Sequence, residues 1–215
     1  MVVAIGVFVT TVQADEIKPV VRVGSKAFTE SVILGEVIRH VGRHSGVNIE
    51  HLAELGGTQV CWKALLAGEI DVYVEYTGTI QKEILDGEPV RDEETMRRLL
   101  NLSQITMSRP LGFNNTYALG ITEEVAQRLE VRTLSELARH SGMKSLKLRF
   151  SDEFLERDDG WKGLANKYGF DPEAARGIDH ALAYRGLQAG SHHVTDVFTT
   201  DAEIRFYNVR VLEDN

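Results

Sequence analysis

The stretch LLAGEIDVYVEYTGT, residues 65–79, predicts a helix end, a tight turn and a strand in close succession. After its Ala-Gly pair the residues alternate as in a half-buried strand, with one face formed by Ile70, Val72, Val74 and Tyr76. The strand stops at an aromatic ring that is followed by two threonines and a glycine. A second stretch, GLQAGSHHVTDVFTTD at residues 186–201, repeats this order, because Phe198 follows Ala189 as Tyr76 follows Ala67. The repeat predicts two equivalent strand ends, one in each half of the chain.

Strands and helices alternate on the N-terminal side of this stretch. Residues 20–25 and 48–55 predict strands, and a helix follows each of them. Thr29 and Thr58 are placed to cap these helices, and the first helix is predicted to carry an apolar side formed by Ile33, Val37, Ile38 and Val41. Alternating β and α segments with short glycine turns predict a mostly parallel sheet covered by helices.

The C-terminal side has the same organisation. A helix over about 92–102 leads through SRPLGFNN, residues 108–115, into a strand that begins at Tyr117. The capping box at 133–136 starts a short helix, and the remaining predicted elements are a strand at 145–150, helices at 161–169 and 180–190, and a strand at 193–198. We therefore expect an α/β fold with two lobes, residues 20–111 and 112–215.

Composition excludes some classes of protein. The chain has 215 residues, 43% of them hydrophobic, which is enough for a substantial core. Its formal charge of −8 and the lack of a basic stripe argue against a nucleic-acid partner, since binding to the nucleic-acid backbone draws on clustered Lys and Arg. Cys61 is the single cysteine, so an intrachain disulfide and a zinc site with two cysteines are excluded. We interpret Cys61 as a small buried hydrophobe.

The N-terminus resembles an export signal. A largely apolar run from Val2 to Val12 is followed by Val-Gln-Ala, a small-x-small sequence of the kind that signal peptidases cleave, and then by charge. We expect residues 1–14 to be the signal-peptide-like segment and the rest to be periplasmic or extracytoplasmic. The usual basic n-region does not precede the run, so the start lies upstream or the run ends a membrane helix of a longer polypeptide. The run itself is too short to span a bilayer.

Several side chains at predicted strand ends suit a zwitterionic ligand. Lys26 lies in GSKAFTE after the first strand, Arg157 lies in the loop FLERDDGW, and Thr79 adds a hydroxyl. Two cations and a hydroxyl can hold a carboxylate through charge-assisted hydrogen bonds. Aromatic faces at Tyr76, Tyr117 and Phe198 can attract a quaternary ammonium. The alternative is structural, with the aromatic rings in the two cores and the cations solvated in loops.

Other chemistries have weaker support in the sequence. His40 and His44 are four apart on a predicted helix and could share a metal, but they fit a solvated face better, and His192 and His193 are adjacent on a strand and point apart. Glu75 and Asp201 are the best pair for a hydrolase, because the repeat could place them across one cleft. Neither lies in a local catalytic signature. We expect no enzyme activity, cofactor or metal.

Five stretches carry a resemblance to a known family. They are, in order, VGSKAFTESVILGEV, LGGTQVCWKALLAGEIDVYVEYTGT, LGFNNTYALGI, EFLERDDGWKGLANKYGF and LAYRGLQAG followed by VFTTDAEI. In order and spacing they resemble the substrate-binding proteins of ABC importers for osmoprotectants such as glycine betaine, choline, carnitine and proline betaine. The resemblance covers residues 21–215 and implies a two-lobed, type II periplasmic-binding-protein fold that closes on its ligand.

The resemblance also implies roles for particular residues. Tyr76, Tyr117 and Phe198 correspond to walls of an aromatic cage, and Phe198 stands where the family has tyrosine, in FTTD instead of YSTD. Lys26, Thr79 and Arg157 correspond to the ligands of the carboxylate. Choline has no carboxylate, so these residues favour betaine-like zwitterions.

Two departures from the family affect the expected lobes. The family continues past the position of Asn215 through a PPY segment with another cage tyrosine and then returns to the first lobe, so we expect that lobe to be incomplete here. SHHVTD, residues 191–196, is more polar than the family's strand, which predicts a weaker core in the second sheet.

The function predicted from the sequence is the extracytoplasmic solute-binding component of an ABC importer. It would bind a small quaternary-ammonium osmoprotectant such as glycine betaine between two lobes and pass it to a membrane permease. The alternative is a sensory or regulatory ligand-binding module that is fused to, or associated with, a membrane protein.

Overall fold

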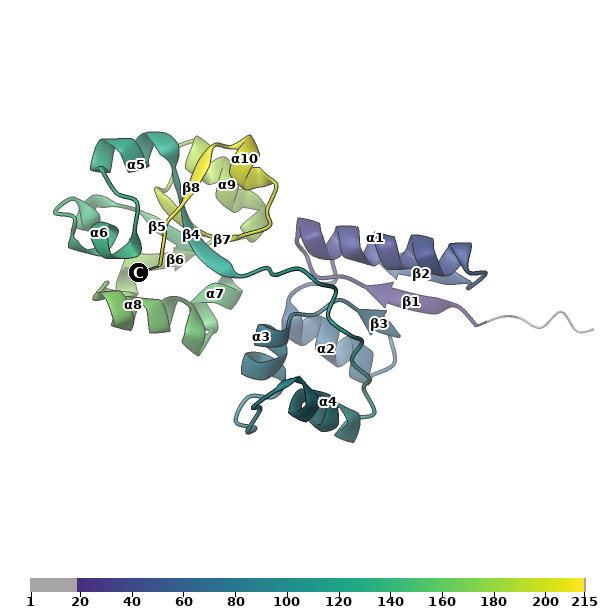
Figure 1. The fold of residues 1–215 in the computed structure, drawn as a ribbon. Helices are drawn as coiled ribbons and strands as arrows, with labels where there is room; N and C mark the ends of the chain where they lie inside the picture. Colours follow the sequence, from purple (N-terminus) through teal and green to yellow (C-terminus); the bar gives the residue numbers. More distant parts are fainter. Residues whose placement is uncertain (1–18, 215) are drawn as a thin grey trace, which may run out of the picture.

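The computed structural model describes residues 19–214, so the predicted signal-like segment 1–14 lies outside the described residues. Two sheets form the centres of two lobes (Figure 1). The first lobe holds β1 (Val21–Gly24), β2 (Ile49–Leu52) and β3 (Val72–Tyr73), in the order β2-β1-β3. The second lobe holds five strands in the order β6-β5-β7-β4-β8, which are β6 (Ala175–Gly177), β5 (Leu148–Phe150), β7 (Val194–Phe198), β4 (Tyr117–Thr122) and β8 (Val209–Val211).

The α/β class is confirmed, and the two sheets differ in strand direction. All pairs of the first sheet are parallel, as predicted. In the second sheet β5, β6 and β7 are parallel, whereas β4 is antiparallel to both β7 and β8. The register pairs Tyr117, the first residue of β4, with Phe198, the last residue of β7. The antiparallel pairing therefore brings two predicted cage residues to the same end of the sheet.

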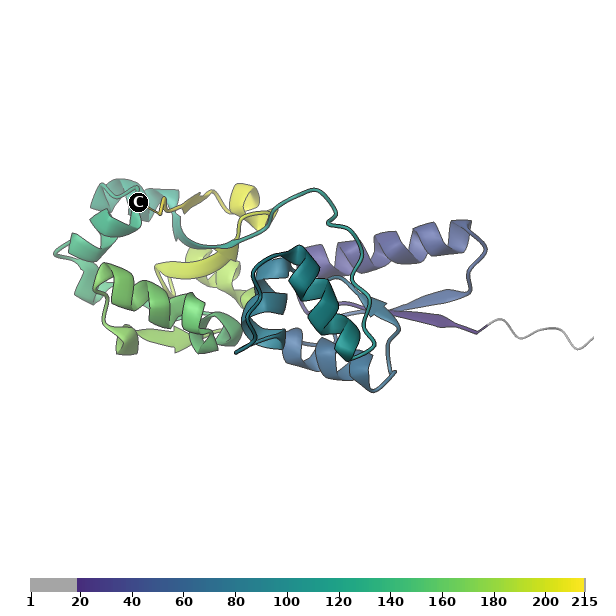
Figure 2. The same cartoon turned by 60° about the horizontal axis from the view of Figure 1, so that its bottom comes forward.

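The helices of the first lobe follow its strands closely, and α1 and α2 cover opposite faces of the sheet (Figure 2). They are α1 (Thr29–His44), α2 (Thr58–Leu66), α3 (Thr77–Thr79), the π-helix η1 (Ile80–Ile84) and α4 (Glu93–Leu102). The predicted caps at Thr29 and Thr58 are wrong, because each is the first helical residue and neither side chain caps its helix. Asp92 does cap α4, accepting a hydrogen bond from the Thr95 backbone nitrogen at 2.7 Å.

The apolar stripe of α1 faces solvent and not the sheet. Ile33, Val37 and Val41 are each at least half exposed. The helix meets the sheet through the small residues Ser31 and Gly35, and a Cβ atom at Gly35 would lie 2.4 Å from Nε2 of His51. The close approach of small residues sets the rotation of α1, so hydrophobic periodicity alone gave the wrong buried face.

The second lobe contains the larger core. Its buried cluster includes Leu119, Ile121, Leu137, Phe150, Trp161 and Val194. The predicted capping box is confirmed, since Thr133 and Glu136 bond reciprocally at the start of α6. The helical segments of this lobe are α5 (Glu123–Leu129), α6 (Leu134–Arg139), η2 (Met143–Ser145), α7 (Asp152–Glu156), η3 (Asp158–Lys162), α8 (Gly163–Tyr168), η4 (Pro172–Ala174), α9 (His180–Gln188) and α10 (Glu203–Phe206).

Of the two buried polar side chains of β7, Asp196 is hydrogen-bonded, whereas the Thr195 hydroxyl has no partner among the described residues. Asp196 is fully buried, and its two oxygens accept from the backbone nitrogen and the hydroxyl of Ser151, both at 2.7 Å. Ser151 in turn accepts from the Phe154 nitrogen and caps α7. A buried carboxylate with such partners loses less of its solvation energy. Through Ser151, Asp196 thus ties the second sheet to α7, the helix that carries part of the pocket.

The chain passes between the lobes along the extended segment that joins α4 to β4 (Figures 1 and 2). The strands up to Tyr73 belong to the first sheet and those from Tyr117 to the second. The division at residues 111 and 112 remains a prediction. None of the helices within residues 19–214 is both long enough and apolar enough to cross a bilayer.

Candidate ligand-binding site

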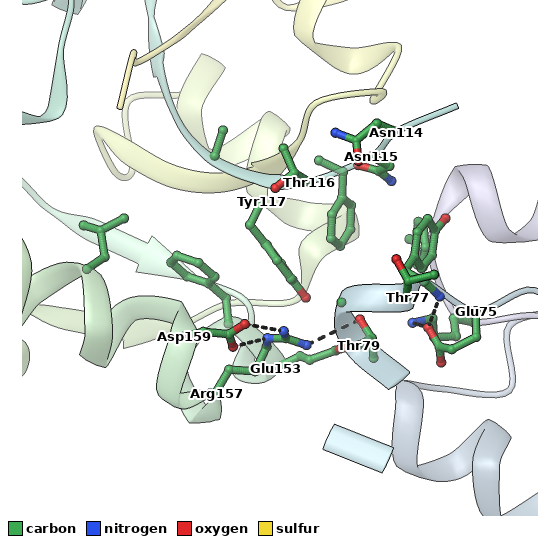
Figure 3. A pocket seen from close by; sticks show the side chains of 18 of the residues that line it. Glu75, Thr77, Thr79, Asn114, Asn115, Thr116, Tyr117, Glu153, Arg157 and Asp159 are labelled. Atoms are coloured by element: carbon green, nitrogen blue, oxygen red, sulfur yellow. Dashed lines mark hydrogen bonds and ion pairs between the residues drawn. The ribbon is translucent and has the colours of Figure 1, made fainter. Parts of the chain in front are cut away.

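A cavity of about 770 Å³ lies between the lobes and is lined by both of them. It opens where β1, β3, β5 and β7 end, the position at which open α/β sheets bind ligands. Figure 3 shows Glu75, Thr77 and Thr79 on one side, Glu153, Arg157 and Asp159 on the other, and Tyr117 extending between them. All six predicted site residues line this cavity, namely Lys26, Tyr76, Thr79, Tyr117, Arg157 and Phe198.

Aromatic rings form a continuous wall of the cavity. The ring centroid of Phe198 lies 5.0 Å from that of Tyr117 and 4.8 Å from that of Phe28. Phe28 lies 6.1 Å from Tyr76 and so connects the two lobes' aromatic groups. Phe28 was missed at the sequence level. The available signal was its place in GSKAFTE, two residues after Lys26 and close to the end of β1.

Tyr76 is held in place by hydrogen bonds at its backbone and at its side-chain hydroxyl. Its backbone nitrogen donates to Oε1 of Glu75 at 2.9 Å, and its hydroxyl donates to Glu30. Asn115, in the segment between the lobes, donates to the same Glu30 oxygen at 2.9 Å. Burial, and then the hydrogen bond to Glu30, raises the pKa of Tyr76, so the hydroxyl stays protonated. Glu75 therefore orients the loop after β3.

Lys26 is almost fully buried, with 3% of its surface exposed. Its ammonium donates to Oε1 of Glu75 at 2.7 Å and to the Thr58 hydroxyl at 3.2 Å. It also lies 5.2 Å from the ring centroid of Tyr76. In this arrangement Lys26 neutralises Glu75 and fixes the loop that carries Tyr76. A direct role with a ligand carboxylate remains a prediction.

Arg157 crosses from the second lobe to the first. It forms a bidentate ion pair with Asp159, at 2.9 and 2.8 Å, and its Nη1 donates to Glu83 at 2.6 Å. The Thr79 hydroxyl lies 3.4 Å from the same nitrogen. The guanidinium also lies 5.5 Å from the ring of Tyr117, whose pKa burial raises. Arg157 is thus a charged group at the meeting point of both lobes and the aromatic wall.

Gly160 shapes the loop that presents Arg157 and Asp159. A Cβ atom at this position would lie 2.2 Å from the carbonyl oxygen of Phe154, which is backbone and cannot rotate away. We expect Gly160→Ala to lower the free energy of unfolding by about 1–3 kcal/mol, measured by urea denaturation. Gly78→Ala is the matched control, because its Cβ atom meets nothing within 4 Å. Equal stability of the two variants would contradict this role of Gly160.

His180 supports Phe198 from behind. The two ring centroids are 4.6 Å apart, and His180 Nε2 and Nδ1 lie 3.3 Å from Asp201 and 3.9 Å from Asp196. Burial disfavours the imidazolium, but the hydrogen bond and charge of Asp201 and the charge of Asp196 outweigh it and raise the pKa of His180. In its protonated form the ring therefore neutralises two buried carboxylates beneath the aromatic wall.

This geometry predicts a pH dependence of stability. Because the folded-state pKa of His180 lies above the ordinary value of 6.5, its stabilising effect is complete below that value and is lost as the pH rises through the folded-state pKa. We expect the parent to lose more unfolding free energy than His180→Gln between about pH 6 and about pH 8, measured by denaturation at each pH. Parallel curves for the two proteins would refute the prediction.

The hydrolase pair is not assembled across the cavity. Glu75 lines the cavity and pairs with Lys26, but Asp201 is not among the lining residues. Asp201 accepts from the Tyr184 hydroxyl at 2.6 Å and from the Phe198 nitrogen at 2.9 Å. Its side chain stabilises the turn after β7 and does not cap α10, whose N-cap is Ala202. The prediction that both carboxylates face one cleft is wrong, because Asp201 points into its own lobe.

The metal and thiol candidates also have structural interpretations. Over residues 19–214 no group of three His, Cys, Asp or Glu side chains is placed to hold a metal ion. His40 lies 3.8 Å from Glu36 on the exposed side of α1. Cys61 is buried, as predicted, and burial raises the pKa of its thiol to about 11.

Two α/β lobes with an aromatic cavity between them define the class of two-lobed solute-binding proteins. The chain belongs to the family described as the substrate binding domain of ABC-type glycine betaine transport systems, whose model matches residues 19–215.

Named relatives agree with this assignment. The chain is 35% identical over 209 residues to the ergothioneine transport permease/ergothioneine binding protein EgtU of Helicobacter pylori, covering 94% of this chain and 37% of that protein. It is 31% identical to the glycine betaine-binding protein YehZ of Escherichia coli, covering 90% and 68%. A crystal structure titled glycine betaine/carnitine/choline ABC transporter superposes with a TM-score of 0.64 at 28% identity, covering 90% and 74%. The chain thus spans from about a third to about two thirds of the length of these curated relatives.

Proposed function

We propose that the protein is the extracytoplasmic solute-binding component of an ABC importer and binds a quaternary-ammonium solute between its lobes. The observation that carries the proposal is the wall formed by Phe28, Tyr76, Tyr117 and Phe198, which come from both lobes and face one cavity. The faces of such rings attract a methylated cation through their quadrupoles. Because each lobe supplies only part of the wall, binding favours closure of the lobes.

The second part of the ligand is a carboxylate. Arg157 and Thr79 are the groups proposed to hold it, since the guanidinium can donate to a carboxylate in a bidentate manner. A ligand carboxylate would compete with Glu83 for Nη1 of Arg157. Lys26 is proposed to act in the same region, through the positive charge that it places beside Tyr76. This arrangement favours betaines over choline.

Glycine betaine, carnitine and ergothioneine are the candidate ligands, because they are named for relatives of this chain. All three join a trimethylammonium group to a carboxylate. The proposed partner is a membrane permease that receives the ligand, and the proposed location is periplasmic or extracytoplasmic. The signal-like segment 1–14 supports that location.

Calorimetric titration of the 215-residue protein with glycine betaine, carnitine, ergothioneine and choline tests the proposal. We expect saturable binding of at least one betaine, with choline weaker because it has no carboxylate. A rise in the unfolding temperature with ligand concentration should accompany binding, since a ligand of the folded state stabilises it. Failure of all four compounds to bind would contradict the proposal, and so would turnover of a bound betaine.

A further inference from the structure

Glu153 is the carboxylate of the cavity that has no cationic partner. Over residues 19–214 the other acids that line the cavity are paired, Glu75 with Lys26, Asp159 with Arg157 and Asp214 with Lys167. Glu83, outside the lining, also pairs with Arg157. No Lys, Arg or His whose side chain the structure describes forms an ion pair with Glu153. The four lining carboxylates, of Glu75, Glu153, Asp159 and Asp214, therefore face three lining cations, Lys26, Arg157 and Lys167. The cavity carries an excess of negative charge that neither the cage nor the proposed carboxylate site requires.

Glu153 lies at the cavity and not in the protein core. It lies on α7 beside Phe154, whose ring contacts Tyr117 at 5.1 Å, and one turn before Arg157. It is partly exposed and lines the cavity, on the same side as Arg157 in Figure 3. Burial, and then the negative charge of Glu153, raises the pKa of Glu83.

One oxygen of Glu153 remains available. Oε1 accepts from the Thr58 hydroxyl at 3.0 Å, across the gap between the lobes. Oε2 accepts no hydrogen bond from residues 19–214, and it is not among the buried atoms without a partner. A carboxylate oxygen at the edge of an aromatic cavity is a strong acceptor for a donor on a ligand. Neither a trimethylammonium group nor a carboxylate can supply such a donor.

We infer that Glu153 is a specificity-determining residue that accepts a hydrogen bond from an N–H group of the ligand. The inference rests on the proposed function and narrows it to betaines that carry an additional N–H donor, such as the ring N–H of an imidazole-derived side chain. The quaternary ammonium would lie against the aromatic wall, the carboxylate near Arg157, and the N–H group against Oε2 of Glu153. The cavity of about 770 Å³ leaves space for such a side chain.

The test compares two ligands on the parent and on Glu153→Gln. Glycine betaine has no N–H group, whereas ergothioneine is a betaine with imidazole-ring N–H groups. Glutamine keeps the length of the side chain and an acceptor oxygen but removes the charge, and charge-assisted hydrogen bonds are about twice as strong as neutral ones. We expect the Kd for ergothioneine to rise roughly tenfold and that for glycine betaine to change less than about threefold.

Two control variants separate recognition from structure. Glu156→Gln removes an exposed charge from the same helix, outside the cavity lining, and should leave both Kd values unchanged. Thr58→Val removes the hydroxyl that contacts Glu153 from the first lobe but keeps the carboxylate. We expect it to keep the parent's ratio of the two Kd values. If Thr58→Val shifts that ratio as Glu153→Gln does, Glu153 acts through the contact between the lobes and the inference is wrong.

The remaining outcomes are also decisive. An equal loss for both ligands in Glu153→Gln would assign Glu153 a general electrostatic role and overturn the inference. No change for either ligand would overturn it as well. Both results leave the proposed function intact, provided that the parent binds glycine betaine. If the parent binds neither of these ligands and also fails to bind carnitine and choline, the proposed function itself fails.

Discussion

Tyr76→Ala is expected to raise the Kd for glycine betaine about 100-fold, because it removes the proposed cation-binding face that the first lobe contributes between β3 and α3. The ring is fixed by Glu75 and Glu30 and packs towards Phe28. It is therefore preorganised, and little ordering cost offsets its contribution to binding. Calorimetric titration of the variant measures the effect directly.

Two variants control for this result. Tyr76→Phe keeps the aromatic face and loses only the hydroxyl bond to Glu30, so its Kd should stay within about tenfold of the parent's. Phe206→Ala removes an aromatic ring that is 80% exposed and outside the cavity lining, so its affinity should be unchanged. Parent-like affinity of Tyr76→Ala would refute the assignment of Tyr76 to the cage.

Arg157→Ala should have effects that depend on the ligand. We expect the Kd for glycine betaine to rise about 10- to 100-fold, since hydrogen bonds to a charged group contribute about 1.5–3 kcal/mol. Choline affinity should stay the same or improve, because the variant leaves Glu83 and Asp159 without their shared cation. Calorimetric titration of the parent and the variant with both ligands gives the ratio of the two Kd values. A change in this ratio is the result that tests the prediction.

The stability of Arg157→Ala must be measured alongside its affinity, because removing one partner of a buried ion pair is destabilising. Lys162→Ala is the matched control, since it removes an exposed cation from the same loop outside the cavity lining. It should leave both affinities unchanged. An equal loss of glycine betaine and choline binding in a folded Arg157→Ala would argue against a carboxylate site at Arg157.

Much of the fold could be predicted because local patterns agree with it. The stretch at residues 65–79 contains the end of α2, the strand β3 and the helix α3, and Tyr76 lies after β3 as the N-cap residue of α3. An aromatic residue and two hydroxyls end the run because this part of the stretch faces the cavity. The same reasoning led from the repeat to Phe198 at the end of β7.

Other features depend on tertiary contacts that the sequence does not display. The rotation of α1 follows from the approach of Gly35 to His51, not from its apolar stripe. Phe28 contributes to the aromatic wall because β1 lies in the middle of the first sheet, between β2 and β3. The turn that follows β1 therefore lies at the cavity. The surplus charge of Glu153 is visible only once the partners of Lys26 and Arg157 are known. Ion pairing between distant segments is thus the part of the site that pattern reasoning could not reach.

The most direct test of the account compares glycine betaine with 3,3-dimethylbutanoate, which has the same shape and carboxylate but a carbon in place of the charged nitrogen. Both are titrated calorimetrically into the parent protein. The account predicts saturable binding of glycine betaine and a Kd for the uncharged-head analogue at least about 30-fold higher, because the aromatic wall recognises the cation. Equal Kd values for the two compounds would contradict it.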